Sequence, residues 1–177
     1  MKYLCAHRWA FNAWGGALHE QEDALAPATG HEVTLRITHC GMCHSDIHIR
    51  EGGFDMGGGK LSSLERSGVK LPVTMGHEIV GEVVEVGPEV KDVSLGMHVV
   101  AYPWLGCGGC AVCEQGDEHL CVKAARNLGI QVPGGYADAL RISHERYLVP
   151  IGGLAPARAA TFACAGITAL GAIRKLP

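Results

Sequence analysis

Residues 76–88 read GHEIVGEVVEVGP, and they contain the clearest strand of the chain. Ile79 to Val86 is rich in β-branched residues and is followed by Gly87 and Pro88, so this run predicts a β-strand. Similar apolar or alternating runs predict strands at Val33–His39, Met97–Tyr102, Tyr136–Ile142 and Tyr147–Ile151. Short strands at irregular spacing with glycine turns are typical of a small barrel or sandwich, so we expect a mainly β fold.

Two stretches predict helices. Ser45–Glu51 fits one or two helical turns with Ser45 or Asp46 as the N-cap. Pro156–Lys175 is alanine-rich, begins with proline and ends with basic residues, which is typical of a helix. Gly52–Val69 is rich in glycine and serine, and we expect a long loop there.

The composition excludes several classes of protein. Of 177 residues, 47% are hydrophobic and 19% are charged, which argues against disorder. The net charge of −3 gives no basic footprint for nucleic acid or an acidic membrane. The longest uncharged apolar run, Ala159–Ile173, is too short to span a membrane, and the first residues lack a secretory signal. We therefore expect a soluble, cytoplasmic protein with reduced thiols.

Four of the eight cysteines form a C-x2-C-x2-C-x7-C pattern: Cys107, Cys110, Cys113 and Cys121. This spacing suits a tetrahedral zinc ion with four thiolate ligands. Disulfides are disfavoured by the expected compartment, and the last gap is too long for a ferredoxin-type iron–sulfur cluster. Four thiolates leave no position for a substrate, so we expect this zinc to be structural.

A second set of possible ligands is Cys43, His77 and Cys164, with Glu78 beside the histidine. Taken singly, a cysteine or a histidine is more often a buried structural residue than a ligand. Together they make a Cys2His set, which is the ligand number of a catalytic zinc with one open position.

These motifs resemble those of the zinc-dependent medium-chain alcohol dehydrogenases, in the same order along the chain. The similar pieces are residues 40–46 (CGMCHSD), 76–78 (GHE), 83–87 (VVEVG), the four-cysteine pattern, 134–138 (GGYAD) and 164–168 (CAGIT). The resemblance implies a partly open, GroES-like β-barrel with short helices and a zinc-binding lobe over residues 1–155. It also implies that residues 156–177 connect to an α/β Rossmann domain absent from this sequence.

The resemblance implies roles for individual residues. Cys43, His77 and Cys164 would bind the catalytic zinc, and Glu78 would lie beside it. Ser45 would accept the proton of the alcohol.

His48 would pass that proton toward solvent, His44 would lie near the pyrophosphate of the cofactor, and Thr168 near the nicotinamide. Trp104 either forms a wall of the substrate pocket or packs in the core. Cys40 matches a position that is not a ligand, so we expect it in the core, and Cys5 has no assigned role.

The implied activity is the interconversion of alcohols with aldehydes or ketones by hydride transfer to NAD or NADP. Two zinc ions per chain would serve it, one catalytic and one structural. The catalytic zinc would act as a Lewis acid on the substrate oxygen. The family also suggests a homodimer or a homotetramer, acting on small molecules and not on nucleic acid or membranes.

Two features depart from the family pattern. The sequence has no G-x-G-x-x-G motif, and we expect a polypeptide of only these residues to lack dehydrogenase activity. The segment between Cys43 and His77 is long, with extra residues around Phe54–Val69. The extra residues either reshape the substrate entrance or a subunit contact, or form a solvated loop.

Two other functions compete with the dehydrogenase. A zinc-stabilised binding or structural module would need only the four-cysteine lobe, so the second ligand set argues against it. A zinc lyase or hydrolase that activates water at the same site would need neither Thr168 nor a cofactor domain.

Overall fold

The computed structural model describes residues 4–123 and 126–176. Residues 1–3, 124–125 and Pro177, which include the outer ends of the two expected domains, lie outside the described residues. The centre of the fold is a five-stranded antiparallel sheet in the order β10-β3-β6-β7-β11. Its strands are β3 (Val33–Gly41), β6 (Glu78–Val86), β7 (His98–Ala101), β10 (Ala139–Ile142) and β11 (Leu148–Pro150).

These strands confirm the five predicted runs, with one shortened at its start. Tyr136–Asp138 does not continue β10, because the backbone there pairs instead with the N-terminal strand: Trp9 N donates to Tyr136 O at 2.8 Å. Val33, Leu35, Ile79, Val99 and Ile142 are fully buried in the main core, as alternation along half-buried strands requires.

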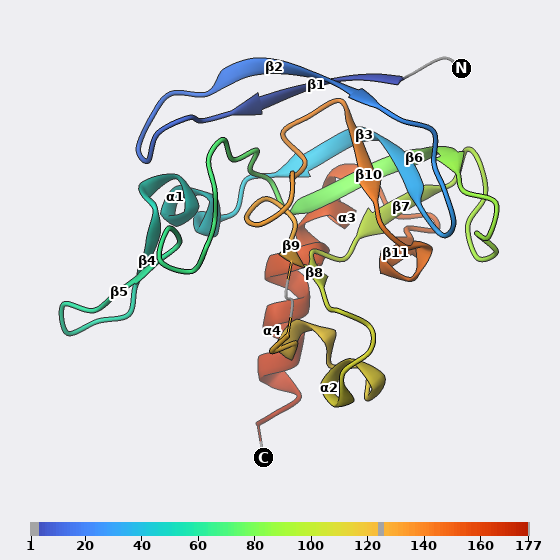
Figure 1. The fold of residues 1–177 in the computed structure, drawn as a ribbon. Coiled ribbons are helices and arrows are strands. Elements are labelled where there is room, and N and C mark those ends of the chain that lie inside the picture. Colours follow the sequence, from blue (N-terminus) through green and yellow to red (C-terminus); the bar gives the residue numbers. More distant parts are fainter. Residues whose placement is uncertain (1–3, 124–125, 177) are drawn as a thin grey trace.

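A hairpin of β1 (Leu4–Ala10) and β2 (His19–Leu25) crosses over this sheet (Figure 1). This hairpin was not predicted. Every described side chain of β2 is exposed or only partly buried, so the strand lacks the apolar alternation that reveals strands in a sequence. Its position depends on backbone pairing with β1, and β1 in turn pairs with residues 136–138.

The helix α1 (His44–Glu51) confirms the predicted helical turn but begins one residue earlier. Its N-cap is Cys43, and neither Ser45 nor Asp46 has that position. Asp46 instead occupies the third helical position, where its carboxylate accepts a hydrogen bond from the Cys43 backbone N–H at 2.9 Å. The capping carboxylate thus comes from inside the helix, as in a capping box.

The segment expected to be a long loop contains a short hairpin, β4 (Gly53–Asp55) and β5 (Leu61–Ser63). Gly57, Gly58 and Gly59 at its turn all have positive φ, which glycine adopts without steric cost. The hairpin projects from the body of the molecule beside α1 (Figure 1). Its base is held by a second apolar cluster that includes Phe11, Ile49, Leu64, Val69, Val73 and Met75.

The cysteine-rich lobe is built from small elements. They are β8 (Trp104–Leu105), α2 (Ala111–Glu114), the 3-10 turn η1 (Glu118–Leu120) and β9 (Arg126–Asn127). A second 3-10 turn, η2 (Glu145–Tyr147), precedes β11 and contacts the lobe through Tyr147. The lobe therefore has little regular structure of its own to hold its backbone in place.

The C-terminal helical segment consists of α3 (Pro156–Thr161), a π-helical turn η3 (Phe162–Gly166) and α4 (Ile167–Ile173). The expected helix is thus confirmed, with Pro156 in its first turn, but it is widened by the π turn. Ala159 and Ala160 pack on Val80 and Ile151 under the sheet.

The same segment, Pro156–Ile173, has a mean hydropathy of 1.2 and is long enough, by length and composition alone, to cross a membrane. By length and composition, the expectation that no segment is long enough to span a membrane was wrong. It considered only the uncharged run Ala159–Ile173, whereas the helical segment begins at Pro156 and includes Arg158. Helices in the cores of soluble proteins satisfy the same length and composition, so these two properties do not show a membrane span. In this structure 17% of the segment is buried.

Candidate active site and metal centres

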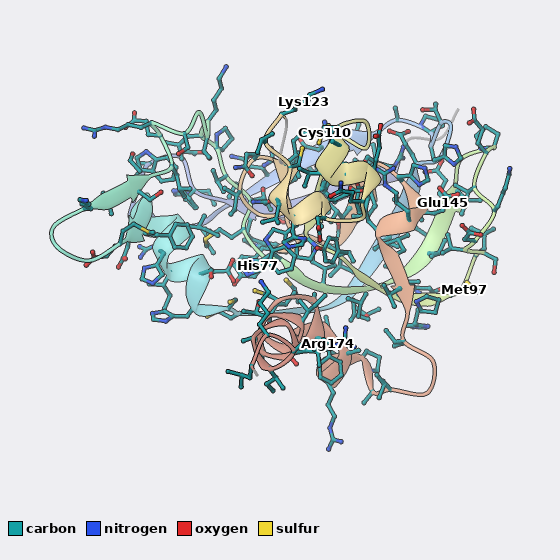
Figure 2. All side chains as sticks on the ribbon, turned by 90° about the horizontal axis from the view of Figure 1, so that it is seen from below. His77, Met97, Cys110, Lys123, Glu145 and Arg174 are labelled. Carbon is teal, nitrogen blue, oxygen red and sulfur yellow. The ribbon has the colours of Figure 1, made fainter. Side chains whose placement is uncertain are left out.

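Cys43, His77 and Cys164 come together although they lie far apart in the sequence. Cys43 precedes α1, His77 precedes β6, and Cys164 lies in the π turn η3. Their ligand atoms all lie within 4.8 Å of one another, and the two sulfur atoms are 3.8 Å apart. Tetrahedral zinc, with Zn–S bonds near 2.3 Å, separates its sulfur ligands by about 3.8 Å. Figure 2 shows His77 between α1 and the C-terminal helix.

Glu78 connects the sheet to the turn that carries Cys164. Its side chain is 3% exposed, and its Oε1 accepts a hydrogen bond from the Ala165 backbone N–H at 3.2 Å. A π turn widens the helix and changes the direction of the residues in it, and such turns often mark functional sites. Glu78, at the start of β6, therefore fixes the backbone of η3 next to Cys164.

Asp46 is a site residue whose role the sequence did not predict. It is 3% exposed and accepts a hydrogen bond from the Gly76 backbone N–H at 3.1 Å in addition to that from Cys43. Its Oδ1 also lies 3.3 Å from His77 Nδ1. His77 Nδ1 is buried, and among the described residues it has no partner with full hydrogen-bond geometry, so the Asp46 carboxylate remains its charged neighbour. A carboxylate on one ring nitrogen leaves Nε2 for a metal, as in many metal-bound histidines.

The two thiols of this site cannot both ionise without a cation. Burial works against ionisation of Cys43, but hydrogen bonds from the Ser45 backbone and from His77 outweigh it and lower the pKa of the thiol. Burial and the nearby Cys43 raise the pKa of Cys164 to about 12. A divalent cation would make both sulfurs thiolates, because metal binding deprotonates a coordinating thiol. The donor set therefore fits a zinc ion.

A cavity of about 240 Å³ opens next to these ligands. Ser45, His77 and Cys164 supply its polar side, and apolar side chains supply most of the rest. Its lining consists of Ser45, Ile49, Phe54, His77, Pro103, Trp104, Asn127, Leu128, Ile130 and Cys164. Trp104 thus lies in the cavity wall, and Phe54 brings the β4–β5 hairpin to the same wall.

Three other candidate residues, His44, His48 and Thr168, are not among the residues that line the cavity. His48 is partly exposed; its ring centre lies 4.7 Å from that of His44 and 5.5 Å from that of Phe54. His44 and Thr168 are exposed, on α1 and α4 respectively. Ser45 lines the cavity three residues before His48, so both lie on one side of α1.

Two cysteines outside both ligand sets differ in burial. Cys40 is partly buried against the main core, as expected, and burial raises the pKa of its thiol to about 12. Cys5 is exposed on β1, where its sulfur lies 3.2 Å from a Glu22 carboxylate oxygen.

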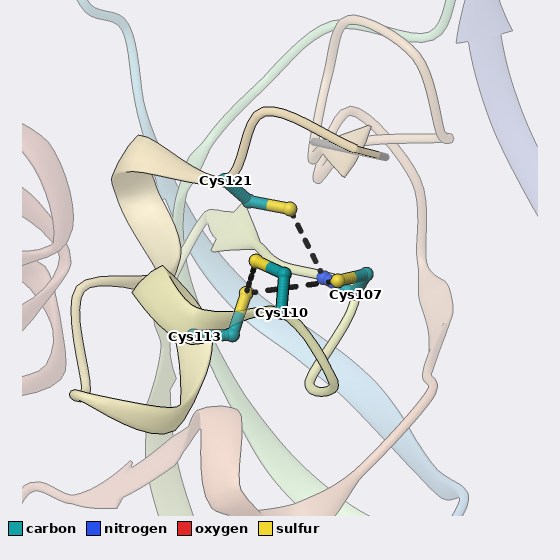
Figure 3. Close-up of side chains that lie close together, drawn as sticks. All are labelled: Cys107, Cys110, Cys113 and Cys121. Carbon is teal, nitrogen blue, oxygen red and sulfur yellow. Dashed lines mark hydrogen bonds between the residues drawn. The ribbon is translucent and has the colours of Figure 1, made fainter.

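The four cysteines of the lobe also converge, with their ligand atoms within 4.8 Å of one another (Figure 3). Cys113 Sγ lies 3.4 Å from Cys110 Sγ and 3.9 Å from Cys107 Sγ, and the Cys107 backbone N–H donates to Cys121 Sγ at 3.4 Å. These separations bracket the spacing of about 3.8 Å expected for tetrahedral zinc. The set is closed by four sulfurs, so it suits a structural ion.

Glu118 and Tyr147 attach this lobe to the barrel. The Tyr147 hydroxyl donates to Glu118, whose carboxylate also accepts the Gly106 backbone N–H at 3.1 Å and lies 3.2 Å from Arg146 Nε. Arg146 also stacks over the Tyr147 ring at 4.8 Å. The four thiols therefore hold the lobe together, and the contacts of Glu118 with Arg146 and Tyr147 attach it to the barrel.

Comparisons with known proteins agree with this geometry. An NAD-dependent alcohol dehydrogenase of Saccharolobus solfataricus is 42% identical over 91% of this chain and 45% of its own length. A D-arabinose dehydrogenase structure from Sulfolobus solfataricus superposes with a TM-score of 0.80 at 29% identity, over 97% of this chain and 48% of its own. A cobalt- and zinc-bound alcohol dehydrogenase structure from Pyrobaculum aerophilum gives 0.78 at 27% identity, over 97% and 49%.

The chain therefore spans about half the length of the curated relatives it matches. The profile of the alcohol dehydrogenase GroES-like domain family matches residues 29–153, which is most of the chain. This match confirms the predicted fold class and the resemblance on which the sequence-based expectations depended. The chain belongs to the alcohol dehydrogenase GroES-like domain family.

Proposed function

We propose that this chain is the catalytic-zinc half of an NAD(P)-dependent alcohol dehydrogenase that interconverts alcohols with aldehydes or ketones. One observation carries the proposal: Cys43, His77 and Cys164 converge on one point that borders a mostly apolar cavity. Three protein ligands beside an open cavity leave a position for a substrate oxygen. A closed, four-cysteine set lies elsewhere in the same chain, so the second set is not needed for structure.

Each residue then has a part in the reaction. Zinc, when bound, supplies a Lewis acid that lowers the pKa of the alcohol hydroxyl. Cys43, His77 and Cys164 hold the ion, and Asp46 and Glu78 hold these ligands in position. Ser45 accepts the hydroxyl proton inside the cavity, and His48 passes it toward solvent.

The hydride acceptor is NAD or NADP, bound by a dinucleotide domain outside the present sequence. In this division residues 1–155 form the catalytic domain and residues 156–177 lead to the cofactor domain. His44 and Thr168 are exposed on the two helices near the zinc ligands, which is compatible with contacts to that cofactor.

The cavity suggests a small, apolar substrate. Ile49, Phe54, Trp104 and Ile130 offer hydrocarbon and ring surfaces. Among the described residues that line the cavity, only Ser45 and Asn127 are polar apart from the zinc ligands. The volume of about 240 Å³ is below the range of about 300–1,000 Å³ typical of drug-sized ligands. We propose short-chain or single-ring alcohols and their carbonyl products.

We further propose a soluble, cytoplasmic enzyme that forms a homodimer or a homotetramer. Six of the eight cysteines belong to the two candidate zinc sites, which supports a reducing compartment. The net charge of −3 supports a small-molecule substrate over nucleic acid.

The binding half of this proposal can be tested on the chain itself. Cobalt replaces zinc, and its visible spectrum reports its ligands. We expect a short-chain alcohol or its carbonyl product to change the cobalt spectrum of the wild-type chain, and to leave the spectrum of Cys43→Ala unchanged. The thiolate absorption of the four-cysteine lobe should remain in the variant and serves as its folding control. Equal spectral changes in both proteins would contradict the proposed site.

The hydride-transfer half requires a cofactor domain. A chimera can join this chain to the part of the NAD-dependent Saccharolobus solfataricus relative that this chain does not match. We expect alcohol-dependent NADH formation by the chimera, loss of it in Cys43→Ala, and none from the isolated chain. Activity of the isolated chain at the rate of the chimera, or activity of the chimera with Cys43→Ala, would overturn the proposal.

A further inference from the structure

A third group of ligand-type side chains lies away from both cysteine sites. His31 lies in the turn before β3, Glu89 follows β6, and His144 and Glu145 begin η2. Figure 2 shows Glu145 well separated from His77 and on the barrel rather than on the lobe. One ligand atom from each of His31, His144 and Glu145 lies within 4.8 Å of the others.

Glu145 is the centre of this group. Its side chain is 3% exposed, and its Oε1 accepts a hydrogen bond from the Lys91 backbone N–H at 3.3 Å. Its Oε2 lies 3.1 Å from His31 Nδ1 and 2.9 Å from His144 Nδ1. A buried carboxylate requires compensation by a proton, a cation or hydrogen bonds.

Each histidine ring also has a second contact, which works against donation of a hydrogen bond from that ring to Glu145. His31 Nε2 lies 3.3 Å from a Glu89 carboxylate oxygen, which favours the tautomer with its proton on Nε2. His144 Nδ1 accepts the Arg146 backbone N–H at 3.2 Å, which favours a lone pair on Nδ1. In these tautomers both nitrogens present a lone pair to Glu145, and neither can donate to it.

Protonation of His31 alone would let its ring donate to both Glu145 and Glu89, but the lone pair of His144 Nδ1 would still face the Glu145 carboxylate. Protonation of both rings would remove that conflict but create another. The two rings are stacked, with centroids 4.2 Å apart and planes 5° apart. Two imidazolium ions at that separation repel each other, because like charges a few ångströms apart interact unfavourably. A single divalent cation on the Glu145 side would satisfy both nitrogens and the carboxylate together.

We propose that His31, His144 and Glu145 form a third metal site, which takes a divalent cation of the zinc, nickel or copper class. Two imidazoles and one carboxylate are the donors that such ions favour. Glu89 would orient His31 through Nε2, as outer carboxylates commonly orient metal-bound histidines.

The protonation states of the group agree with metal binding. Burial works against ionisation of Glu145, but hydrogen bonds from the backbone outweigh it, and the pKa of this carboxyl is below its usual range. Burial lowers the pKa of His144, which favours the neutral ring. An ionised carboxylate and a neutral imidazole are the forms that coordinate a metal.

Metal binding would require the stacked rings to separate, since one ion cannot lie in two parallel ring planes. The side chains of His31 and His144 are 37% and 31% exposed, so each has room to tilt. The bound ion would join the turns before β3, after β6 and after β10. This inference does not depend on the proposed dehydrogenase activity.

Metal counting tests the site. Cys5, His7 and Glu22 also bring three ligand-type atoms together, so every chain in this test carries Cys5→Ala, which removes that group. The chains are dialysed to equilibrium against Zn²⁺, and the bound ions are measured by mass spectrometry. We expect three ions in this parent chain, one for each cysteine site and one for the His31 group, and two ions when His144→Ala or Glu145→Gln is added. His19→Ala, which removes an exposed histidine on β2, should keep all three.

Cobalt titration separates the sites by ligand type and shows whether a variant is folded. With Cys5 replaced by alanine, only the two cysteine sites should give thiolate-to-cobalt absorption, so the third ion should bind without adding to that band. If His144→Ala loses the thiolate band, that variant is not folded, and Glu145→Gln takes its place in the comparison. Glu145→Gln disturbs the fold less because glutamine keeps one of the two side-chain oxygen acceptors. Two ions in the Cys5→Ala parent chain would reduce the group to an ion-pair cluster and overturn the proposal. Three ions in a variant with an intact thiolate band would also overturn it.

Discussion

Replacing Asp46 by asparagine tests how the metal ligands are held in place. The carboxylate accepts from the Cys43 N–H at 2.9 Å and the Gly76 N–H at 3.1 Å, and it lies 3.3 Å from His77 Nδ1. Asparagine has one side-chain oxygen in place of two, so its NH₂ group must face one of these two backbone N–H donors. At least one charge-assisted hydrogen bond is lost, together with the contact that orients His77.

The size of the effect follows from these losses. One hydrogen bond to a charged group contributes about 1.5–3 kcal/mol, so we expect the free energy of unfolding to fall by that amount. Removing an outer-shell carboxylate from a metal-bound histidine lowers metal affinity by about 10- to 100-fold. That loss equals about 1.4–2.8 kcal/mol of binding free energy at the Cys43–His77–Cys164 site.

The assay is competition for Zn²⁺ with a coloured chelator, combined with urea unfolding of the same samples. The four-cysteine lobe should keep its affinity and so provides an internal control, and Asp92→Asn on the surface provides a matched variant. Unchanged affinity at the Cys43 site in Asp46→Asn would refute the orienting role. An equal loss at both sites would show a general loss of folding instead.

Three other changes test other parts of the structure. Gly76→Ala should destabilise the fold by about 1–3 kcal/mol, because its Cβ would lie 2.7 Å from Cys40 Sγ and from Tyr136 Cδ1. Thermal unfolding measures this loss. Gly58→Ala is the control: Gly58 also has a positive φ but has open space around it, so its loss of stability should be smaller. Glu118→Gln should cost about 1–3 kcal/mol in urea unfolding of the zinc-loaded chain, since it weakens the contacts with Arg146 and Tyr147; an effect no larger than that of the exposed Glu114→Gln would contradict this. Phe54→Ala should enlarge the cavity and shift binding toward bulkier alcohols by about tenfold, measured by cobalt spectroscopy; an unchanged preference would remove Phe54 from the substrate wall.

The strands that the sequence predicted carry apolar side chains that are buried. Val33 and Leu35 in β3, and Ile79 and Val83 in β6, pack in the main core, and Val80 of β6 packs against the C-terminal helix. The β1–β2 hairpin lacks this signal, because β2 is exposed or half-buried along its described side chains and depends on backbone pairing. The β4–β5 hairpin was missed because its glycines and serines are also typical of a loop.

The ligand sets were predictable for a different reason. Local spacing identifies the four-cysteine lobe, and the resemblance to a family linked Cys43, His77 and Cys164 across more than a hundred residues. Asp46 was assigned only to a helix cap, because nothing local indicates that its carboxylate also reaches Gly76 and His77. The His31, His144 and Glu145 group comes from turns that only the folded sheet brings together.

Diffraction at the zinc absorption edge from crystals of the zinc-loaded chain tests the central claim most directly. The account predicts an anomalous peak bonded to Cys43 Sγ, His77 Nε2 and Cys164 Sγ, with its fourth position open to the cavity, and a separate peak enclosed by the four cysteines of the lobe. A peak in the lobe alone, with Cys43 and Cys164 bound to no metal, would contradict it.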